Sequence, residues 1–321
     1  MKKLAVLTSG GDAPGMNAAV RAVVRRSADR GVGVEGVRRG FAGLLAREFL
    51  PLGPREVGNI LQRGGTFLGT SRPPEMKSPQ GRKQAVQALR EDGIDGLVVI
   101  GGDGSQRAAH ALSREGAAVV GVPATIDNDL YGTDHTIGFD TAVNTALEAI
   151  DRLRDTAQSL ERAFFVEVMG RTRGFIALEV AIAGGAGEVL VPETETNLDE
   201  LCASLSAAFQ RGKKSPLVVV AEGDIPGGAL AIAQQVGARL KIDYRVCILG
   251  HVQRGGAPTA RDRVLAGKLG VAAVDALLEG KAGSLVGEMG GRLTLTPLEE
   301  VARKAKPLDP SLLALAKVLA R

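Results

Sequence analysis

The sequence contains no tryptophan, and aromatic residues make up only 3% of its 321 residues. Proteins that bind single-stranded nucleic acid stack the bases on aromatic side chains, and this chain has few of them. Its formal charge of +4 is mild, and its lysines and arginines are spread along the chain instead of gathering in a basic tail. We therefore expect no nucleic-acid partner, and small anionic ligands fit the charge better.

Cysteine is almost absent as well, since the chain has only Cys202 and Cys247. They lie far apart and match no zinc spacing, which favours a reduced, cytoplasmic protein. No apolar run approaches the length that spans a membrane, and the first one ends in Gly-Gly-Asp, which is too early for a signal peptide. We expect neither a membrane partner nor any cysteine chemistry.

Short apolar runs rich in β-branched residues recur along the chain and alternate with amphipathic stretches. This alternation predicts an α/β fold with a largely parallel sheet covered by helices. The length favours two domains, and the 43 glycines indicate many tight turns. The predicted strands are 4–8, 96–100, 118–122, 163–169, 216–221 and 245–249, and the clearest helices are 17–30, 80–92 and 141–158.

Two segments share the order strand, Gly-Gly-Asp, tight turn and helix. Gly101, Gly102 and Gly104 would let a phosphate approach the backbone amides that open the following helix, and Asp103 could hold magnesium. In the twin segment, Gly11 could lie against a transferring phosphate. A plain turn between strand and helix is the alternative for either loop alone.

A strongly acidic loop, "VPATIDNDLYGTDHTIGFD", follows the strand at 118–122. If its Thr-Ile-Asp-Asn-Asp run is extended, Thr125, Asp127 and Asp129 share one face, because side chains two apart point to the same side. Such a face suits a cation or a group to be deprotonated. The alternative is a solvated turn, since Asn and Asp are frequent turn residues.

Two familiar nucleotide-binding motifs are excluded. The Walker-type pattern GxxxxGK[ST] does not occur, and the GxGxxG match at 31–36 follows a helix and enters a strand, which is the wrong order for a dinucleotide fold.

Cationic residues stand in other loops. Arg72 and Lys77 occupy a proline-rich loop, where nucleotide phosphates or solvent are equally plausible partners. Past later strand ends, glycines accompany residues suited to a sugar phosphate, namely Arg171, Arg173, His251 and Arg254, and Glu222 could accept hydrogen bonds from sugar hydroxyls.

Six motifs in order, "TSGGDAPGMNA", "RGGTFLGTSR", "VIGGDGS", "TIDND", "VEVMGR" and "LGHVQRGG", make the chain closely similar to the bacterial ATP-dependent 6-phosphofructokinases. The resemblance implies transfer of the γ-phosphoryl group of MgATP to the 1-hydroxyl of fructose 6-phosphate in glycolysis. It also implies two Rossmann-like α/β domains with the active site in the cleft between them. The ATP domain would contain residues 1–139 and 253–304, and the fructose 6-phosphate domain 140–252 and 305–321.

The resemblance assigns roles to individual residues. Asp127 looks like the general base, with Asp129 orienting the site and Thr125 near the transferring group, while Arg72 and Arg171 would stabilise that group. Around ATP and its magnesium, with Asp103 as the metal ligand, the family pattern places Gly11, Phe41, Arg72, Lys77, Gly102, Asp103, Gly104 and Ser105. Phe41 and Lys77 replace the more usual Tyr and Arg.

Fructose 6-phosphate binding would involve the site residues Thr125, Asp127 and Asp129 as well. The resemblance adds Met169, Arg171, Glu222, His251 and Arg254 of one subunit, and Arg162 and Arg245 from a neighbour. Catalysis would therefore need a homo-oligomer, which in this family is a tetramer.

The family also carries an effector site for ADP or phosphoenolpyruvate. Its cationic residues match Arg21, Arg25, Arg154, Arg211, Lys213 and Lys214. Pro54 replaces an Arg, Ser215 replaces a His, and Gly187 replaces a magnesium-binding Glu, with Glu188 displaced by one position. These departures predict inhibition by phosphoenolpyruvate and weakened activation by MgADP.

Two other functions remain open. A pyrophosphate-dependent phosphofructokinase has Asp at position 104 and Lys at position 124, where this chain has Gly104 and Ala124. A non-catalytic, phosphate-sensing regulatory subunit would be expected to lose the base or the magnesium carboxylate, but Asp103, Asp127 and Asp129 are all present.

Overall fold

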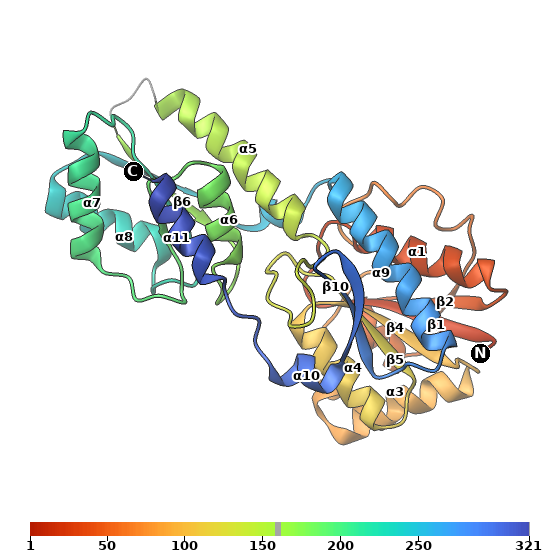
Figure 1. The fold of residues 1–321 in the computed structure, drawn as a ribbon. Helices are drawn as coiled ribbons and strands as arrows, with labels where there is room; N and C mark the ends of the chain where they lie inside the picture. Colours follow the sequence, from red (N-terminus) through yellow and green to blue (C-terminus); the bar gives the residue numbers. More distant parts are fainter. Residues whose placement is uncertain (158–161, 321) are drawn as a thin grey trace. The chain divides into compact units, whose positions relative to one another are not determined.

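The computed structural model describes residues 1–157 and 162–320, and its internal contacts divide the chain into two units (Figure 1). The first unit contains Met1–Thr141 and Arg254–Lys306, and the second contains Ala142–Gln253 and Pro307–Arg321. The assignment of ATP to one unit and fructose 6-phosphate to the other remains a prediction.

A seven-stranded sheet forms the first unit. Its strand order is β11-β10-β5-β4-β1-β2-β3, and only the pairs at its two edges, β10 with β11 and β2 with β3, are antiparallel. The strands are β1 (Lys3–Ser9), β2 (Gly33–Val37), β3 (Phe49–Leu52), β4 (Gly96–Gly101), β5 (Val119–Pro123), β10 (Ser284–Met289) and β11 (Arg292–Pro297).

Helices cover both faces of this sheet because its central strands are apolar on both sides. In β1, Leu4 points toward α9, whereas Ala5 and Leu7 belong to the core on the opposite face. The helices α1 (Met16–Asp29) and α9 (Ala260–Leu278) pack on one face (Figure 1). The other face carries α2 (Gly40–Leu45), η1 (Pro74–Lys77), α3 (Pro79–Glu91), α4 (Asp103–Arg114) and α10 (Leu298–Arg303).

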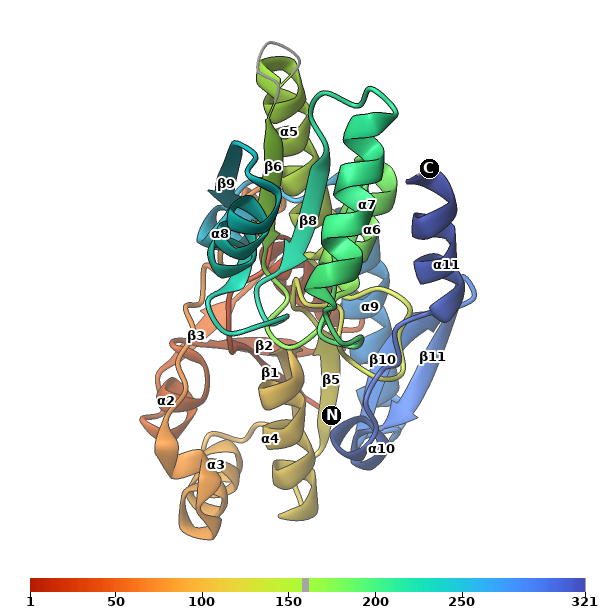
Figure 2. The same cartoon turned by 90° about the vertical axis from the view of Figure 1, so that its left-hand side faces the viewer.

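The second unit has a four-stranded sheet that is parallel throughout, in the order β7-β8-β6-β9 (Figure 2). Its strands are β6 (Ala163–Val168), β7 (Glu188–Leu190), β8 (Leu217–Ala221) and β9 (Tyr244–Ile248). Apolar residues of β6 and β8 pack against α7 (Leu198–Gln210) and α8 (Gly228–Leu240). The remaining helices are α5 (Phe139–Ala157), α6 (Phe175–Ala183), α11 (Pro310–Leu319) and the short η2 (Gly250–Arg254).

The α/β class with mostly parallel sheets, predicted from the sequence, is confirmed. All six apolar runs predicted as strands are strands, and the three clearest helices appear as α1, α3 and α5 with ends shifted by one or two residues. The predicted end of the third helix, Gln158, lies outside the described residues. Cys202 and Cys247 are free thiols, and in the described part of the chain no helix is long and apolar enough to cross a membrane.

Candidate active site

Three neighbouring strands of the first unit end level with one another. Ser9 of β1 pairs with Gly101 of β4, which in turn pairs with Pro123 of β5. The strands are parallel, so the loops that follow them leave from the same edge of the sheet, where open α/β sheets bind ligands. The two Gly-Gly-Asp loops and the acidic loop are thus brought side by side.

A buried glutamine, missed by the sequence analysis, ties two of these strand ends together. The Nε2 atom of Gln106 donates to the carbonyl oxygens of Gly101 at 2.8 Å and Val122 at 3.1 Å. Gln106 is fully buried, and its place directly after "GGDGS" was the available signal.

The first glycine-rich loop lies against an arginine from a distant segment. A Cβ atom on Gly11 would lie 2.6 Å from Nη1 of Arg254, so the guanidinium rests on the Gly11 backbone. Nε of Arg254 is buried without a hydrogen-bond partner among the described residues. The structure therefore places Arg254, predicted as a fructose 6-phosphate ligand, beside the glycine predicted to meet the transferring phosphate.

The second glycine-rich loop opens α4 and leaves space at one position. Gly102 is the N-cap of α4, and its Cβ would lie 3.1 Å from Cβ of Thr125 in the acidic loop. A Cβ on Gly104 would meet no atom within 4 Å. Ser105 is 3% exposed, and its Oγ has no hydrogen-bond partner in the described part of the chain. The N–H of Ser105 already donates to the carbonyl of Gly102 at 2.9 Å, so the amides of Asp103 and Gly104, beside open space, are the ones that suit a phosphate.

Asp103 has the chemistry of a magnesium ligand, but its carboxylate already binds the guanidinium of Arg107. Both of its carboxylate oxygens accept from Nε of Arg107 at 3.0 Å, and its side chain is 33% exposed. No cluster of three or more metal-binding side chains occurs among residues 1–157 and 162–320. Magnesium uses few carboxylates together with water and substrate phosphates, so one accessible aspartate beside a phosphate loop fits this ion.

The acidic loop is not extended, so the condition for a shared face of Thr125, Asp127 and Asp129 is not met, and the alternative of a turn is confirmed. Ile126 and Asp127 form a turn, and Asn128 adopts the left-handed region with φ 52°. The cause is local, because the N–H of Asp127 donates to Oγ1 of Thr125 at 3.2 Å and asparagine tolerates this conformation better than most residues. Asp127 is 6% exposed, whereas Asp129 is more open.

Side-chain hydrogen bonds hold this turn in place. The Asn128 amide accepts from the N–H of Thr136 at 3.0 Å and donates to the carbonyl of Asp134 at 3.2 Å. Ile137 donates to the carbonyl of Pro123 and accepts from the N–H of Thr125, both at 3.0 Å. The segment after the turn therefore lies beside the end of β5 in a parallel bridge between Ala124 and Ile137, and it fixes Thr125.

The remaining residues predicted to contact ATP differ in accessibility. Arg72 is exposed, two residues after Thr70, whose Oγ1 donates to the carbonyl of Gly10 at 2.9 Å. Lys77 is exposed at the end of η1. Phe41 is 3% exposed within the apolar core of the first unit, so its ring offers no open face on which a base could stack.

In the second unit, a carboxylate holds an arginine loop. Oε1 of Glu222, just past β8, accepts from the N–H of Arg171 at 2.7 Å, and Arg171 has a left-handed φ of 55°. A Cβ on Gly223 would lie 1.9 Å from the carbonyl oxygen of Arg171. Met169 is buried and donates from its N–H to Oε1 of Gln253 at 2.8 Å. The loops after β6 and β8 thus meet at the carboxyl edge of this sheet, where Arg171 is exposed.

Two predicted substrate ligands lie at the opposite edge of this sheet. Arg162 directly precedes β6, and Arg245 is the second residue of β9, paired with Phe164 near the start of β6. A strand of five or six residues spans about 17–20 Å. Arg162 and Arg245 are therefore separated from Arg171 of the same chain by the length of the sheet. His251 is exposed in η2, after the carboxyl end of β9.

The predicted effector residues of the second unit form a real cationic cluster. Burial, followed by the charges of Arg154 and Arg211, lowers the pKa of Lys213. Arg154 donates to the carbonyls of Gly184 and Gly185. Lys214 is exposed nearby in sequence. Arg21 and Arg25 lie on α1 of the first unit, where burial and then the charge of Arg25 lower the pKa of Arg21.

The displaced carboxylate of this cluster is already engaged. Glu188 accepts from the hydroxyl of Ser204 on α7. A Cβ on Gly187 would lie 3.3 Å from Nζ of Lys213, so the residue that faces the cation carries no carboxylate.

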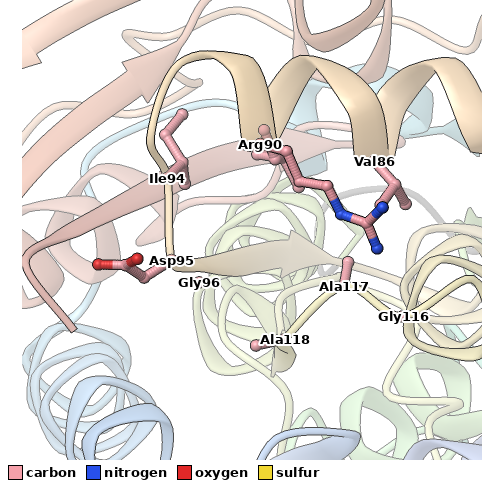
Figure 3. Close-up of a pocket in the computed structure, with 9 residues that line it drawn as sticks. Val86, Arg90, Ile94, Asp95, Gly96, Gly116, Ala117 and Ala118 are labelled. Carbon is pink, nitrogen blue, oxygen red and sulfur yellow. The ribbon is translucent and has the colours of Figure 1, made fainter.

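A small pocket of about 170 Å³ lies at the amino ends of β4 and β5, away from all these loops. In Figure 3 the guanidinium of Arg90 lies over Ala117, while the carboxylate of Asp95 points the other way. None of the predicted site residues lines this pocket.

The carboxyl edge of the parallel strands in the first unit gathers two glycine-rich loops, an accessible aspartate, a buried aspartate and an adjacent arginine. Together they define an α/β phosphoryl-transfer enzyme. The comparison with known proteins makes this class specific. The phosphofructokinase family model matches residues 3–277, and the chain belongs to this family.

Curated relatives match over the full chain. The chain is 57% identical over 321 residues to the ATP-dependent 6-phosphofructokinase 1 of Thermus thermophilus, covering 100% of both chains. It is 49% identical over 319 residues to the ATP-dependent 6-phosphofructokinase of Bacillus cytotoxicus, covering 99% of both.

Solved structures agree with this assignment. Phosphofructokinase from Saccharomyces cerevisiae matches with a TM-score of 0.85 and 36% identity, over 100% of this chain and 48% of that one. A pyrophosphate-dependent phosphofructokinase from Marinobacter aquaeolei matches with a TM-score of 0.85 and 25% identity, over 97% of this chain and 86% of that one. Because the second of these structures is a pyrophosphate-dependent enzyme, the fold alone does not specify the phosphoryl donor.

Proposed function

We infer that this chain transfers the γ-phosphoryl group of ATP to the 1-hydroxyl of fructose 6-phosphate, giving fructose 1,6-bisphosphate and ADP in glycolysis. The observation that carries this inference is the level arrangement of the loops after β1, β4 and β5, which gathers phosphate-binding amides and Asp127 at one edge. Product analysis by ³¹P NMR tests it, because fructose 1,6-bisphosphate shows two phosphate monoesters. A product that still carries a single phosphate would overturn the inference.

ATP is the preferred donor in this proposal. Open space at Gly104 leaves room for the rest of a nucleotide, whereas an aspartate there would repel its α-phosphate. Ala124 is fully buried and pairs with Ile137, so this position has no room for a lysine that would bind pyrophosphate. Changing Gly104→Asp should raise the KM for ATP roughly tenfold or more. An unchanged KM would show that position 104 does not contact the nucleotide.

In the proposed reaction Asp127 accepts the proton of the 1-hydroxyl while the hydroxyl oxygen attacks the γ-phosphorus. The bond from phosphorus to the β-γ bridging oxygen breaks, and ADP leaves with that electron pair. The charge on the transferring group would be neutralised by Arg254, which lies against Gly11, together with Arg72 and Arg171. Thr125 and Asp129 flank the base, and the turn at Asn128 sets its direction.

Magnesium, when bound with ATP, screens the charge of the β- and γ-phosphates. Asp103 is the residue that would hold the ion, and its hydrogen bonds with Arg107 would have to break first. The amides that begin α4, those of Asp103 and Gly104, would orient the phosphates.

Sugar-phosphate recognition is proposed to need a second copy of this chain. Met169, Arg171, Glu222 and His251 lie at or beyond the carboxyl edge of the second sheet, while Arg162 and Arg245 lie at its amino edge. One chain cannot bring both groups onto one small sugar, so a neighbouring subunit would supply the second group, within a cytoplasmic homotetramer.

Mixing two inactive variants tests this sharing. In an equal mixture of Asp127→Asn and Arg245→Ala subunits, random pairing leaves about a quarter of the shared sites intact. Refolded mixtures should then recover about a quarter of wild-type activity, while each variant alone stays low. No recovery from the mixture would place both groups in one subunit.

Regulation is proposed to follow from the cationic cluster around Lys213. Phosphoenolpyruvate needs cations and no metal, so it should bind there and inhibit, whereas Gly187 offers no carboxylate for the magnesium of MgADP. Glu188 already accepts from the hydroxyl of Ser204, although its charge acts on Lys213 and opposes the lowering of the pKa of that lysine. Titrating both ligands at subsaturating fructose 6-phosphate, in wild type and Arg25→Ala, checks this ranking. Strong MgADP activation without a phosphoenolpyruvate effect would contradict it.

A further inference from the structure

The buried carboxylate of Asp262 on α9 accepts hydrogen bonds from residues 138–141, where the acidic loop ends and α5 begins. Asp262 is 1% exposed, and its Oδ1 accepts from the N–H of Gly138 at 2.9 Å. Its Oδ2 accepts from the N–H of Thr141 at 2.8 Å and from the hydroxyl of the same threonine. Three donors thus converge on one side chain that lies more than a hundred residues away along the chain.

Residues 137 and 138, next to the bonds with Asp262, contact two of the loops assigned to catalysis. Ile137, next to Gly138, exchanges backbone hydrogen bonds with Pro123 and Thr125, and Thr125 in turn caps the turn that contains Asp127. A Cβ on Gly138 would lie 2.7 Å from Cβ of Ala13, in the loop that contains Gly11. Movement of Gly138 would therefore be transmitted to the base and to the first glycine-rich loop.

Other contacts confine the same junction. Gly15, with φ 105° at the start of α1, has space for no side chain because its Cβ would lie 2.6 Å from Cγ2 of Ile137. Oγ1 of Thr259 donates to Asp140 at 2.6 Å, so the segment before α9 also holds this region. Buried hydrogen bonds to an acceptor with two oxygens rigidify what they connect.

We propose that Asp262 is a positioning residue for phosphoryl transfer, which fixes Asp127 and the Gly11 loop relative to each other through Gly138 and Thr141. The proposal rests on the transfer reaction inferred above. It goes beyond a general stabilising role, because it assigns to Asp262 an effect on turnover that exceeds its effect on substrate binding.

The carboxylate is suited to this task because all three of its partners are donors. An amide at this position would turn an N–H group toward one of those donors and lose at least one bond. Asp262→Asn should therefore lower kcat at least tenfold, while the KM values for ATP and fructose 6-phosphate change less than threefold. Hydrogen exchange of the backbone amides of Gly138 and Thr141 should become faster.

Asp275→Asn is the matched control. Asp275 lies on the same helix and accepts from Nε and Nη2 of Arg26 on α1 at 2.9 and 3.0 Å, so it binds helix to helix without reaching the catalytic loops. This variant should lower the unfolding temperature but leave kcat within twofold of wild type.

Thr141 provides a second test if Asp262→Asn does not fold. Thr141→Val removes the hydroxyl that donates to Asp262 and should lower kcat, whereas Thr141→Ser keeps the hydroxyl and should restore it. Equal kcat values for Asp262→Asn and Asp275→Asn, or equal values for the two Thr141 variants, would overturn the proposal. If wild type itself transferred no phosphoryl group from ATP, the proposed function would fail instead, so the two failures are distinguishable.

Discussion

The acidic loop of the first unit and the Arg171 loop of the second hold their functional groups in opposite ways. Asp127 is 6% exposed in a turn secured by side-chain hydrogen bonds of Asn128, and Asp262 holds the nearby Gly138. Arg171, by contrast, is an exposed side chain on a backbone that is held by Glu222. A base must be placed within hydrogen-bond reach of one proton, while a guanidinium gains from reach and from five donors. We therefore expect the first loop to place the base, and the second loop to serve both capture of the sugar phosphate and neutralisation of the transferring group.

The largest effect is expected from the base itself. Asp127→Asn should lower kcat roughly 10²-fold or more, because the amide cannot accept the proton at a useful rate. Fructose 6-phosphate binding, measured by calorimetry, should change little. A loss of turnover below tenfold with binding intact would mean that Asp127 is not the base.

Gly223→Ala, which changes the Arg171 loop, is expected to have a smaller effect on activity than Asp127→Asn. The added Cβ would overlap the carbonyl of Arg171 and displace its loop, so kcat/KM for fructose 6-phosphate should fall roughly tenfold. Gly267→Ala on α9 is the control, because a Cβ there meets no atom within 4 Å and should be neutral or add roughly 0.5–1 kcal/mol to helix stability. If both variants behaved alike, the packing of Gly223 on Arg171 would not matter for the substrate.

The smallest effect concerns pH and the acidic loop. Burial, then the charges of Arg261 and Lys306, lowers the pKa of His135, while Asp134 and Asp140 oppose the shift. The folded state thus holds this proton less tightly than the unfolded state. Stability from the neutral histidine is present above its ordinary pKa of about 6.5 and is lost as pH falls below it.

Urea unfolding at pH 7.5 and 5.5, at one protein concentration, measures this loss. His135→Gln should reduce the difference in unfolding free energy between the two pH values, since glutamine does not titrate. An undiminished difference would assign the pH dependence to other groups.

The sequence was most informative where structure is local. Apolar runs predicted the strands, and the Gly-Gly-Asp turns predicted the loops, because both depend on residues close together in the chain. The sequence left open whether the run around Asn128 is extended or a turn, and hydrogen bonds to Asp134 and Thr136, which only the fold provides, decide for the turn. Asp262 was missed for a related reason, since its partners lie on a segment that only the folded chain brings to it.

Residue identity alone also could not decide the environment of Phe41. An aromatic residue near a nucleotide site can stack on a base or fill the core, and only the packing of α2 against the sheet shows the second. The separation of Arg162 from Arg171 already follows from the predicted strand 163–169 between them, whereas the position of Arg245 near Arg162 required the pairing of β9 with β6.

The central claim is that these loops transfer a phosphoryl group from ATP to fructose 6-phosphate. A coupled assay that detects fructose 1,6-bisphosphate, run with fructose 6-phosphate and either MgATP or magnesium pyrophosphate, tests it most directly. The account predicts turnover with ATP and little or none with pyrophosphate, as Gly104 and Ala124 require. Equal rates with the two donors, or no turnover with ATP, would contradict it.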